Sequence, residues 1–267
     1  TAVAFLYSAN PPIQVGVAPG AIEEERPAVL RGRITDRLGV PLRGVHVSVL
    51  AHPEFGYTTT RADGWFDMVV NGGGELVVDY SLPGFIPIQR SIETRWKDYI
   101  IIPEAILIPF DTAVSTIDLT GPGIQVARGT VSTDADGARQ PTLLFAPGTT
   151  ALVHLPNGAS ASVETLHVRA TEFTVGASGP RAMPAGLPET SGYTYAAELS
   201  IDEAIVEGAT SVEFSQPVYA YLENFIGAPV GTGVPSGFYD RAQGVWVASR
   251  TGRVISVGSE TAGGSGL

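Results

Sequence analysis

Apolar and polar residues alternate with a period of two along the first third of the chain. In 45–49, valines alternate with histidine and serine, the pattern of a strand with one buried face. Residues 57–61 and 65–70 flank Ala-Asp-Gly at 62–64, a combination typical of a β-hairpin turn. The sequence therefore predicts a small antiparallel sandwich near the start of the chain.

Further strands are predicted at short intervals around this hairpin. Together with its two strands, the candidates are 29–34, 44–50, 57–61, 65–70, 76–80 and 85–93. The apolar stretch 99–119 is interrupted by Pro103 and Pro109. Because proline cannot donate to a ladder, we expect short edge or crossing strands there. We place the first domain at 29–119, after an extended segment at 1–28.

A second series of strands follows Thr-Gly-Pro-Gly at 120–123, which marks the predicted domain boundary. We place a second β domain at 124–258, interrupted by a Gly/Pro-rich loop at 176–192, and a flexible linker at 259–267. The first residues and this tail suggest a piece of a longer polypeptide. The strand candidates are 125–131, 141–145, 151–155, 162–170, 173–175, 193–199, 211–214, 218–225, 245–248 and 253–257.

One short helix is predicted in the second domain. Residues 200–203, Ser-Ile-Asp-Glu, fit a capping box, and Gly208 is placed to end the helix. The chain also holds 32 Gly and 20 Pro, which favour turns over long helices. The predicted fold is all-β, with two tandem antiparallel β-sandwich-like domains and one short helix.

Composition excludes several classes of function. The formal net charge of −11 gives no face that would neutralise phosphates, so we expect no nucleic-acid partner. Cysteine is absent, which excludes disulfides and thiol chemistry. The uninterrupted apolar runs fall far short of the roughly 20 residues that a membrane helix needs, so no membrane span is expected.

No residue combination in the sequence predicts catalysis. His52 and Glu54 form a His-carboxylate pair, but the chain lacks the spacing of a metalloprotease motif, and we interpret them as loop residues. Asp134 and Asp136 resemble the start of a calcium loop, but Phe145 stands where the loop requires its last glutamate. We therefore expect a turn there, and no catalytic residue, cofactor or metal.

Residues 32–66, "GRITDRLGVPLRGVHVSVLAHPEFGYTTTRADGWF", resemble the carboxypeptidase-regulatory-like or transthyretin-like domain. That resemblance implies a sandwich that serves as a scaffold. The start of the second domain, "FAPGTTALVHLPNGAS", resembles ZU5-like β domains. Some of these precede a segment that cleaves itself at a Phe-Ser bond with the help of a preceding histidine. Here Glu213 stands in that place, so we expect no self-cleavage.

Longer phrases resemble the region that precedes the shell in bacterial Rhs/YD-repeat proteins, which are related to teneurin and Tc-toxin shells. These phrases include "TRADGWFDMVVNGGGEL", "VARGTVSTDADGARQPTLLF", "SGYTYAAELSIDEA" and "VPSGFYDRAQGVWV". The resemblance implies a non-enzymatic structural module of a secreted or bacterial cell-surface protein. Such a module would pack on, or plug the end of, a YD-repeat shell of the same polypeptide, which in some relatives encloses a toxin.

Aromatic residues gather late in the chain and are the candidate shell-facing or partner-facing residues. Tyrosine and tryptophan favour positions with one apolar and one wet side. A sandwich core with its rim is the alternative interpretation of the same residues. The alternative function is an adhesion module that binds a cell-surface glycan or protein. The candidates are Tyr219, Tyr221, Phe225, Phe238, Tyr239 and Trp246.

Overall fold

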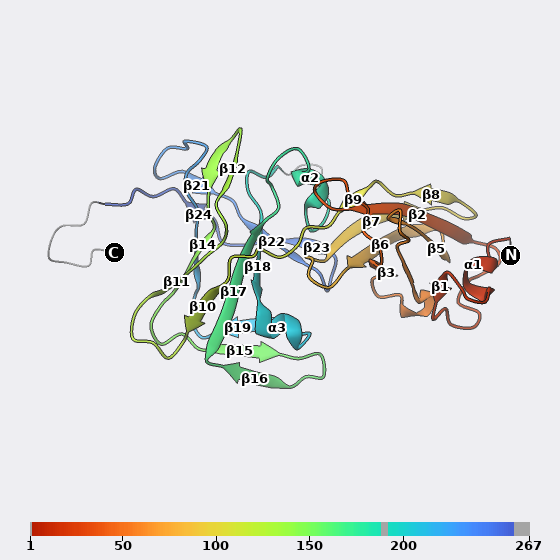
Figure 1. Ribbon diagram of the computed structural model, residues 1–267, viewed down its shortest axis with the longest axis horizontal. Coiled ribbons are helices and arrows are strands. Elements are labelled where there is room, and N and C mark those ends of the chain that lie inside the picture. The colour runs from red at the N-terminus through yellow and green to blue at the C-terminus, as the bar shows by residue number, and fades with distance from the viewer. Residues whose placement is uncertain (1, 188–191, 259–267) are drawn as a thin grey trace.

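The computed structural model describes residues 2–187 and 192–258, which form two β-rich units placed end to end (Figure 1). Strands β1 to β9 form the first unit, and strands from β10 onward form the second. The predicted all-β fold is confirmed, because the helices in the described ranges are single short turns. The predicted linker at 259–267 and part of the 176–192 loop lie outside the described residues.

The first unit is a sandwich of two sheets. One is antiparallel with the order β1-β4-β3-β6-β7, and the other has the order β5-β2-β8. Strands β8 and β9 both run parallel to β2, as short strands around the two prolines. The bounds are α1 Phe5–Ser8, β1 Gln14–Val15, β2 Pro27–Thr35, β3 His46–Val49, η1 Pro53–Phe55, β4 Tyr57–Thr59, β5 Trp65–Asn71, β6 Gly74–Ser81, β7 Ile88–Thr94, β8 Tyr99–Ile101 and β9 Ala105–Ile106.

Local sequence explains the centre of this sandwich. In β3, Val47 and Val49 are buried while His46 and Ser48 are partly exposed, so the predicted alternation is confirmed. The predicted turn between β4 and β5 forms with Gly64 at φ +78°, a conformation that glycine adopts without strain. Asp63 supports the turn by accepting a hydrogen bond from the backbone N–H of Trp65 at 3.1 Å.

The segment before β2 is more than an extended arm. It contains α1 and β1, and Gln14 in β1 is buried inside the sandwich. The Gln14 side chain donates to the carbonyl oxygens of Phe55 (2.6 Å) and Val69 (2.9 Å) and accepts from the backbone N–H of Val69 (2.7 Å). The prediction of a purely extended segment at 1–28 is therefore corrected.

The second unit is built from three-stranded sheets with the orders β10-β17-β18, β11-β14-β20 and β16-β15-β19, together with three two-stranded ribbons. The bounds are β10 Ser115–Asp118, β11 Gln125–Arg128, β12 Ser132–Asp134, β13 Gly137–Arg139, β14 Thr142–Phe145, β15 Ala151–His154, β16 Ser160–Val163, β17 Thr165–Glu172, α2 Gly179–Ala182, β18 Ala197–Ile201, α3 Asp202–Val206, β19 Ser211–Phe214, β20 Tyr219–Tyr221, β21 Gly233–Val234, β22 Gly237–Asp240, β23 Val245–Ala248 and β24 Gly252–Arg253.

Two of these sheets form one bent layer. Strand β14 leads into β15, and β19 leads into β20. Strand β15 pairs with β19, and β14 pairs with β20. The pair β14–β20 therefore continues the pair β15–β19, and the two sheets join into one layer that bends between them. The sheet β10-β17-β18 packs against this layer through a core that includes Ile117, Leu166 and Val168 on one side and Leu143 and Phe145 on the other.

Two sequence expectations are corrected here. Strand β10 was expected at the end of the first domain, but it pairs with β17, so the units separate before Ser115 and not at 120–123. The helix α3 is present, but Ser200 lies in β18 and no side chain caps the helix. The Glu203 carboxylate instead accepts from the backbone N–H of His167 at 3.0 Å. Gly208 ends the helical turn at φ +61°, as predicted.

Candidate interaction surface

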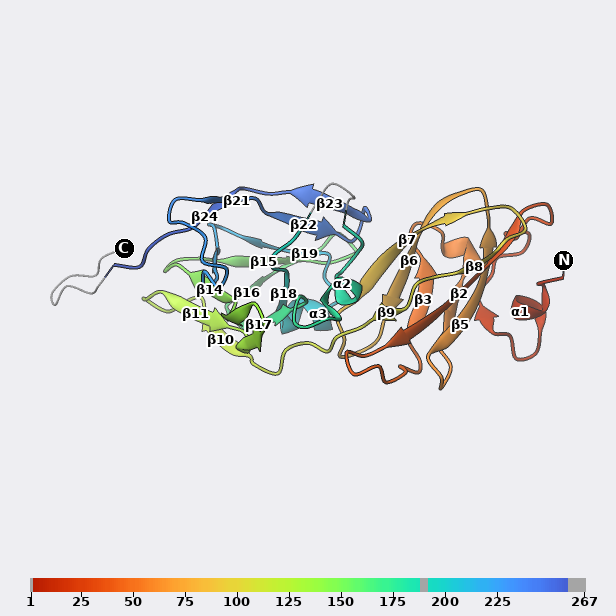
Figure 2. The same cartoon turned by 90° about the horizontal axis from the view of Figure 1, so that it is seen from above.

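An apolar joint connects the two units. It is a cluster of six side chains, each at most 2% exposed, and both units contribute to it. Helix α2 and the β22–β23 hairpin face the first unit at this joint (Figure 2). Such close packing stabilises one relative orientation of the units, because separation would expose all six side chains to water. The cluster comprises Ile86, Ile106 and Ile108 from the first unit and Phe173, Ala182 and Met183 from the second.

Hydrogen bonds surround this apolar cluster. The Arg90 guanidinium donates to the carbonyl oxygens of Arg181 (2.5 Å) and Met183 (3.1 Å), and burial lowers the pKa of Arg90. The backbone N–H of Gln89 donates to the Pro184 carbonyl at 2.7 Å. A strand of the first unit, β7, is therefore fixed to the second unit through both side-chain and backbone donors.

Two of the six predicted aromatic residues belong to this joint. The Tyr239 hydroxyl donates to Gln89 Oε1 at 2.6 Å, and burial raises the pKa of Tyr239. The Trp246 indole N–H donates to the Gly186 carbonyl at 2.9 Å, and the two rings lie 5.3 Å apart. Tyr239 and Trp246 therefore contact parts of the same chain.

Phe225 also makes an internal contact. Its ring lies 4.9 Å from the guanidinium of Arg139, which is itself buried. Arg139 donates to the carboxylates of Asp134 (2.7 and 2.8 Å) and Glu172 (2.6 Å). This contact holds the pKa of Asp134 well below its usual range. Strands β12 and β13 form the expected turn at 134–137, and the Asp134 carboxylate is occupied by an ion pair.

The other predicted aromatic residues face outward to different degrees. Tyr219 and Phe238 are 62% and 53% exposed, and Tyr221 is partly exposed. They belong to a segment with a common property: none of the residues 201–258 is buried, although β19 to β24 form regular ladders there. The structure thus places Tyr239 and Trp246 at the joint, Phe225 in a contact within the second unit, and Tyr219, Tyr221 and Phe238 at a surface that is exposed or partly exposed.

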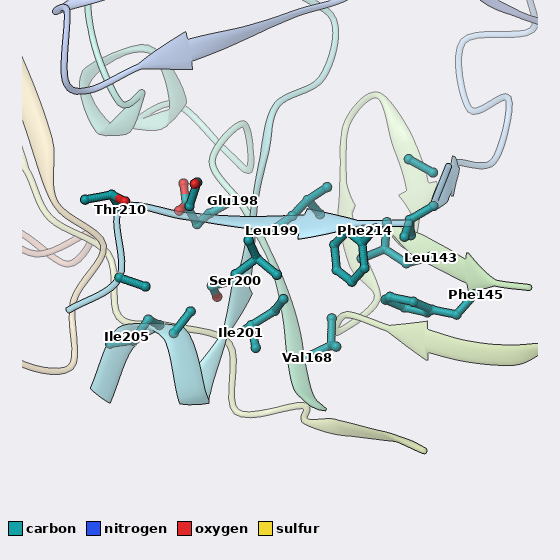
Figure 3. Close-up of a pocket in the computed structure, with 16 residues that line it drawn as sticks. Leu143, Phe145, Val168, Glu198, Leu199, Ser200, Ile201, Ile205, Thr210 and Phe214 are labelled. Atoms are coloured by element: carbon teal, nitrogen blue, oxygen red, sulfur yellow. The ribbon is translucent and has the colours of Figure 1, made fainter. Parts of the chain in front are cut away.

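An apolar groove opens at the edge of the second unit (Figure 3). Its volume is about 410 Å³, and Leu143, Phe145, Val168 and Phe214 converge on its floor. Strand β18 forms one wall, β19 and the start of β20 form the other, and α3 lies at one end. Glu198 is the single charged residue among the described residues that line it.

The histidine candidates form isolated pairs. His52 Nδ1 lies 2.8 Å from Glu54 Oε1 on the surface. His154 Nε2 lies 3.2 Å from Glu213 Oε2 on neighbouring strands. Across the described residues, no three His, Asp or Glu side chains are grouped as a metal site would require. These pairs are side-chain contacts between one histidine and one glutamate each, at or near the surface.

Comparison with known proteins shows that the first unit is similar to one known family. Residues 22–107 match the teneurin TTR-like domain. Teneurin-m of Drosophila melanogaster is 44% identical over 79 residues, which are 30% of this chain and 3% of that protein. Teneurin-1 of Gallus gallus is 34% identical over 106 residues, which are 39% of this chain and 4% of that protein. The chain thus spans only a few per cent of the length of these curated relatives.

Solved structures resemble the chain only distantly. A streptococcal ancillary pilin aligns with 53% of this chain and 60% of its own, at 12% identity and a TM-score of 0.27. The major pilin subunit of Bacillus cereus aligns with 86% of this chain and 69% of its own, at 10% identity and a TM-score of 0.24. Superpositions of this quality carry no argument about function.

The first unit contains two residues that contact the second unit and that the sequence does not single out. Gln89 and Arg90 bind the second unit, but they lie in an ordinary alternating strand, and their partners are about 90 to 150 positions away. The groove was also missed, because it arises where strands distant in sequence end side by side.

No helix in the described ranges is long and apolar enough to cross a membrane.

Proposed function

We propose that the chain is a non-enzymatic structural module of a larger secreted or bacterial cell-surface protein. In this proposal the TTR-like unit and the second β unit form one rigid piece. That piece packs on, or plugs the end of, a YD-repeat shell of the same polypeptide, which encloses a toxin in some relatives. The relation of residues 22–107 to teneurins supports the scaffold role.

The observation that carries the proposal is the exposed segment at the end of the second unit. Its ladders are regular, yet none of the residues 201–258 is buried, and large apolar side chains face solvent. A large buried aromatic or aliphatic side chain contributes roughly 1.5–3 kcal/mol. A few such contacts would hold a tethered module on a shell. The exposed apolar residues of this segment include Tyr219, Ile226, Val230, Phe238, Val245 and Ile255.

The joint between the units supports the same role. A module that plugs a shell requires its two units to keep a fixed orientation, and a flexible linker between them would not provide one. The six-residue apolar cluster and the donors of Gln89 and Arg90 fix the two units together instead. The YD-repeat shell is the expected partner because the late phrases of the chain resemble pre-shell regions.

Hydrogen exchange tests this proposal. Exchange is measured for this chain alone and for a polypeptide in which a YD-repeat shell follows it. We expect protection in 219–246 to rise when the shell is present, while β3 and β6 remain unchanged. The exposed substitution Phe238→Asp should weaken binding to a separately produced shell, whereas Leu38→Asp, which is 88% exposed on the first unit, should not. Identical exchange in both proteins would favour a passive spacer or an adhesion module.

A further inference from the structure

We propose that the groove between β18 and β19–β20 accepts an added β-strand from another polypeptide. The occupant would be an extended segment with apolar side chains at alternating positions and basic residues at its ends. This inference does not depend on the shell proposal, because it rests on the groove lining and on the open edges of β18, β19 and β20, and not on the exposed side chains proposed to face a shell.

The first observation is that core-facing residues are exposed at this edge. Residues directly opposite each other on adjacent strands point to the same face of a sheet. Leu199 is opposite the buried Ala170, and Ala220 is opposite the buried Leu143. Both therefore face the core, yet Leu199 is 50% exposed and Ala220 is exposed. The core of the second unit is open on this side.

The opposite side of the same core is closed. There, β10 lies beside β11, and the core residues of the closed part are at most 5% exposed. The contrast lies within one unit, so general looseness of the fold does not explain it. Where β18 faces β19 and β20, in contrast, the core-facing side chain of Leu199 is half exposed. The buried core residues that do not line the groove are Ile117, Ala127, Ala151 and Leu166.

The second observation is the state of the flanking strands. Among the described strands, β18 pairs only with β17, β19 only with β15, and β20 only with β14. Each therefore presents an edge, and unpaired backbone donors and acceptors along an edge are a template for another strand. A strand laid in the groove would meet an edge on both sides and would close the sandwich, the mode of recognition known as strand addition.

The acidic surroundings of the groove favour basic residues at the ends of the added strand. Of the sixteen residues that line the groove, all within the described ranges, none is basic, and the one charged residue, Glu198, forms an ion pair with Arg241 at 2.6 Å. Glu207 and Glu213 are exposed on the elements that flank it. The chain as a whole carries a net charge of −11. Lysine or arginine at the ends of the added strand would therefore be attracted, and an acidic strand would be repelled.

A labelled peptide on the full 267-residue chain tests the inference. The probe is Lys-Thr-Val-Thr-Val-Thr-Val-Thr-Lys, and fluorescence anisotropy measures its Kd. A permuted peptide with the three valines contiguous keeps composition and charge but loses the alternation. A third peptide, N-methylated at the central valine, keeps the apolar side chains but removes a backbone donor. We expect both control peptides to bind at least about tenfold more weakly.

Two substitutions locate the site. Leu199→Asp places a carboxylate in the groove and should weaken binding at least about tenfold, although the added negative charge alone would attract the basic peptide. Val206→Asp is the matched control, because Val206 is 83% exposed on α3 and does not line the groove. Hydrogen exchange should show new protection in both β18 and β19 when the alternating peptide is bound.

Several results would overturn the inference. Equal binding of the N-methylated peptide would make the groove an apolar pocket without strand pairing. No saturation up to about 1 mM peptide, or equal loss in Leu199→Asp and Val206→Asp, would remove the site. Concentration-dependent dimerisation that protects β18 and β19 without peptide would make a second copy of the chain the occupant.

Discussion

The joint between the units makes the two sandwiches one cooperative structure, and Phe173 is the side chain that tests this. Phe173 directly follows β17, and its side chain is 1% exposed within the apolar cluster. A fully buried phenylalanine removes about 150 Å² or more from water, which at about 25 cal/mol per Å² corresponds to roughly 4 kcal/mol. Because the surrounding isoleucines cannot fully collapse, Phe173→Ala should destabilise the chain by about 3–5 kcal/mol.

The assay is urea unfolding followed separately by tryptophan fluorescence and by circular dichroism. If the units unfold together, both probes show one transition, and Phe173→Ala moves it as a whole. Ile108→Ala, which empties the same cluster from the first unit, should move the same transition by about 2–5 kcal/mol. The double variant should show a coupling energy of about 0.5–3 kcal/mol, because the two side chains share one cluster.

The control is Phe238→Ala, which removes the same ring from a position that is 53% exposed. It should change stability by no more than about 0.5 kcal/mol. Two separate transitions, with Phe173→Ala acting only on the second and Ile108→Ala only on the first, would refute a rigid joint. A loss below about 1 kcal/mol for Phe173→Ala would refute the burial argument itself.

The remaining predictions concern single contacts. Arg139→Met leaves the buried Glu172 carboxylate without its cation and should cost about 3–5 kcal/mol in chemical unfolding, whereas Arg253→Met, on the exposed β24, should cost little. The lowered pKa of Asp134 contributes stability that is present above its unfolded pKa and lost as the pH falls below about 4; acid unfolding of Arg139→Met should lack this contribution. Gly56→Ala should destabilise by more than about 1 kcal/mol in thermal unfolding, because Gly56 has φ +62° and a Cβ there would lie 2.0 Å from the Val15 carbonyl oxygen. Gly20 also has a positive φ but free space around it, so Gly20→Ala measures the backbone cost without a steric clash.

Elements that depend on neighbouring residues were predictable from the sequence. The turns at 62–64 and 134–137 formed as expected, because the φ values that Gly64 and Gly137 adopt are positive and glycine permits them locally. The same holds for the alternation in β3. These features require no knowledge of the rest of the chain.

Elements that depend on distant partners were not predictable. Residues 115–118 follow the apolar stretch of the first unit within a few positions, but their partner strand β17 begins at Thr165. The capping box failed for the same reason. Pairing with β17 drew Ser200 into a strand, and the Glu203 carboxylate found a better donor in His167. Strand pairing thus overrides the local capping motif, even though the Ser200 hydroxyl has no hydrogen-bond partner among the described residues.

The aromatic segment shows the limit of reasoning from composition. The aromatic residues predicted to face a partner cluster in the sequence but separate in the structure. Tyr239 and Trp246 donate hydrogen bonds to Gln89 and Gly186, whereas Tyr219 and Phe238 are exposed. Residue type does not distinguish the two pairs, because the joint depends on contacts with residues that are distant in the sequence. The same reasoning explains the groove. Leu199 has the sequence signature of a buried strand residue, and only the three-dimensional arrangement shows that its cover must come from outside the described strands.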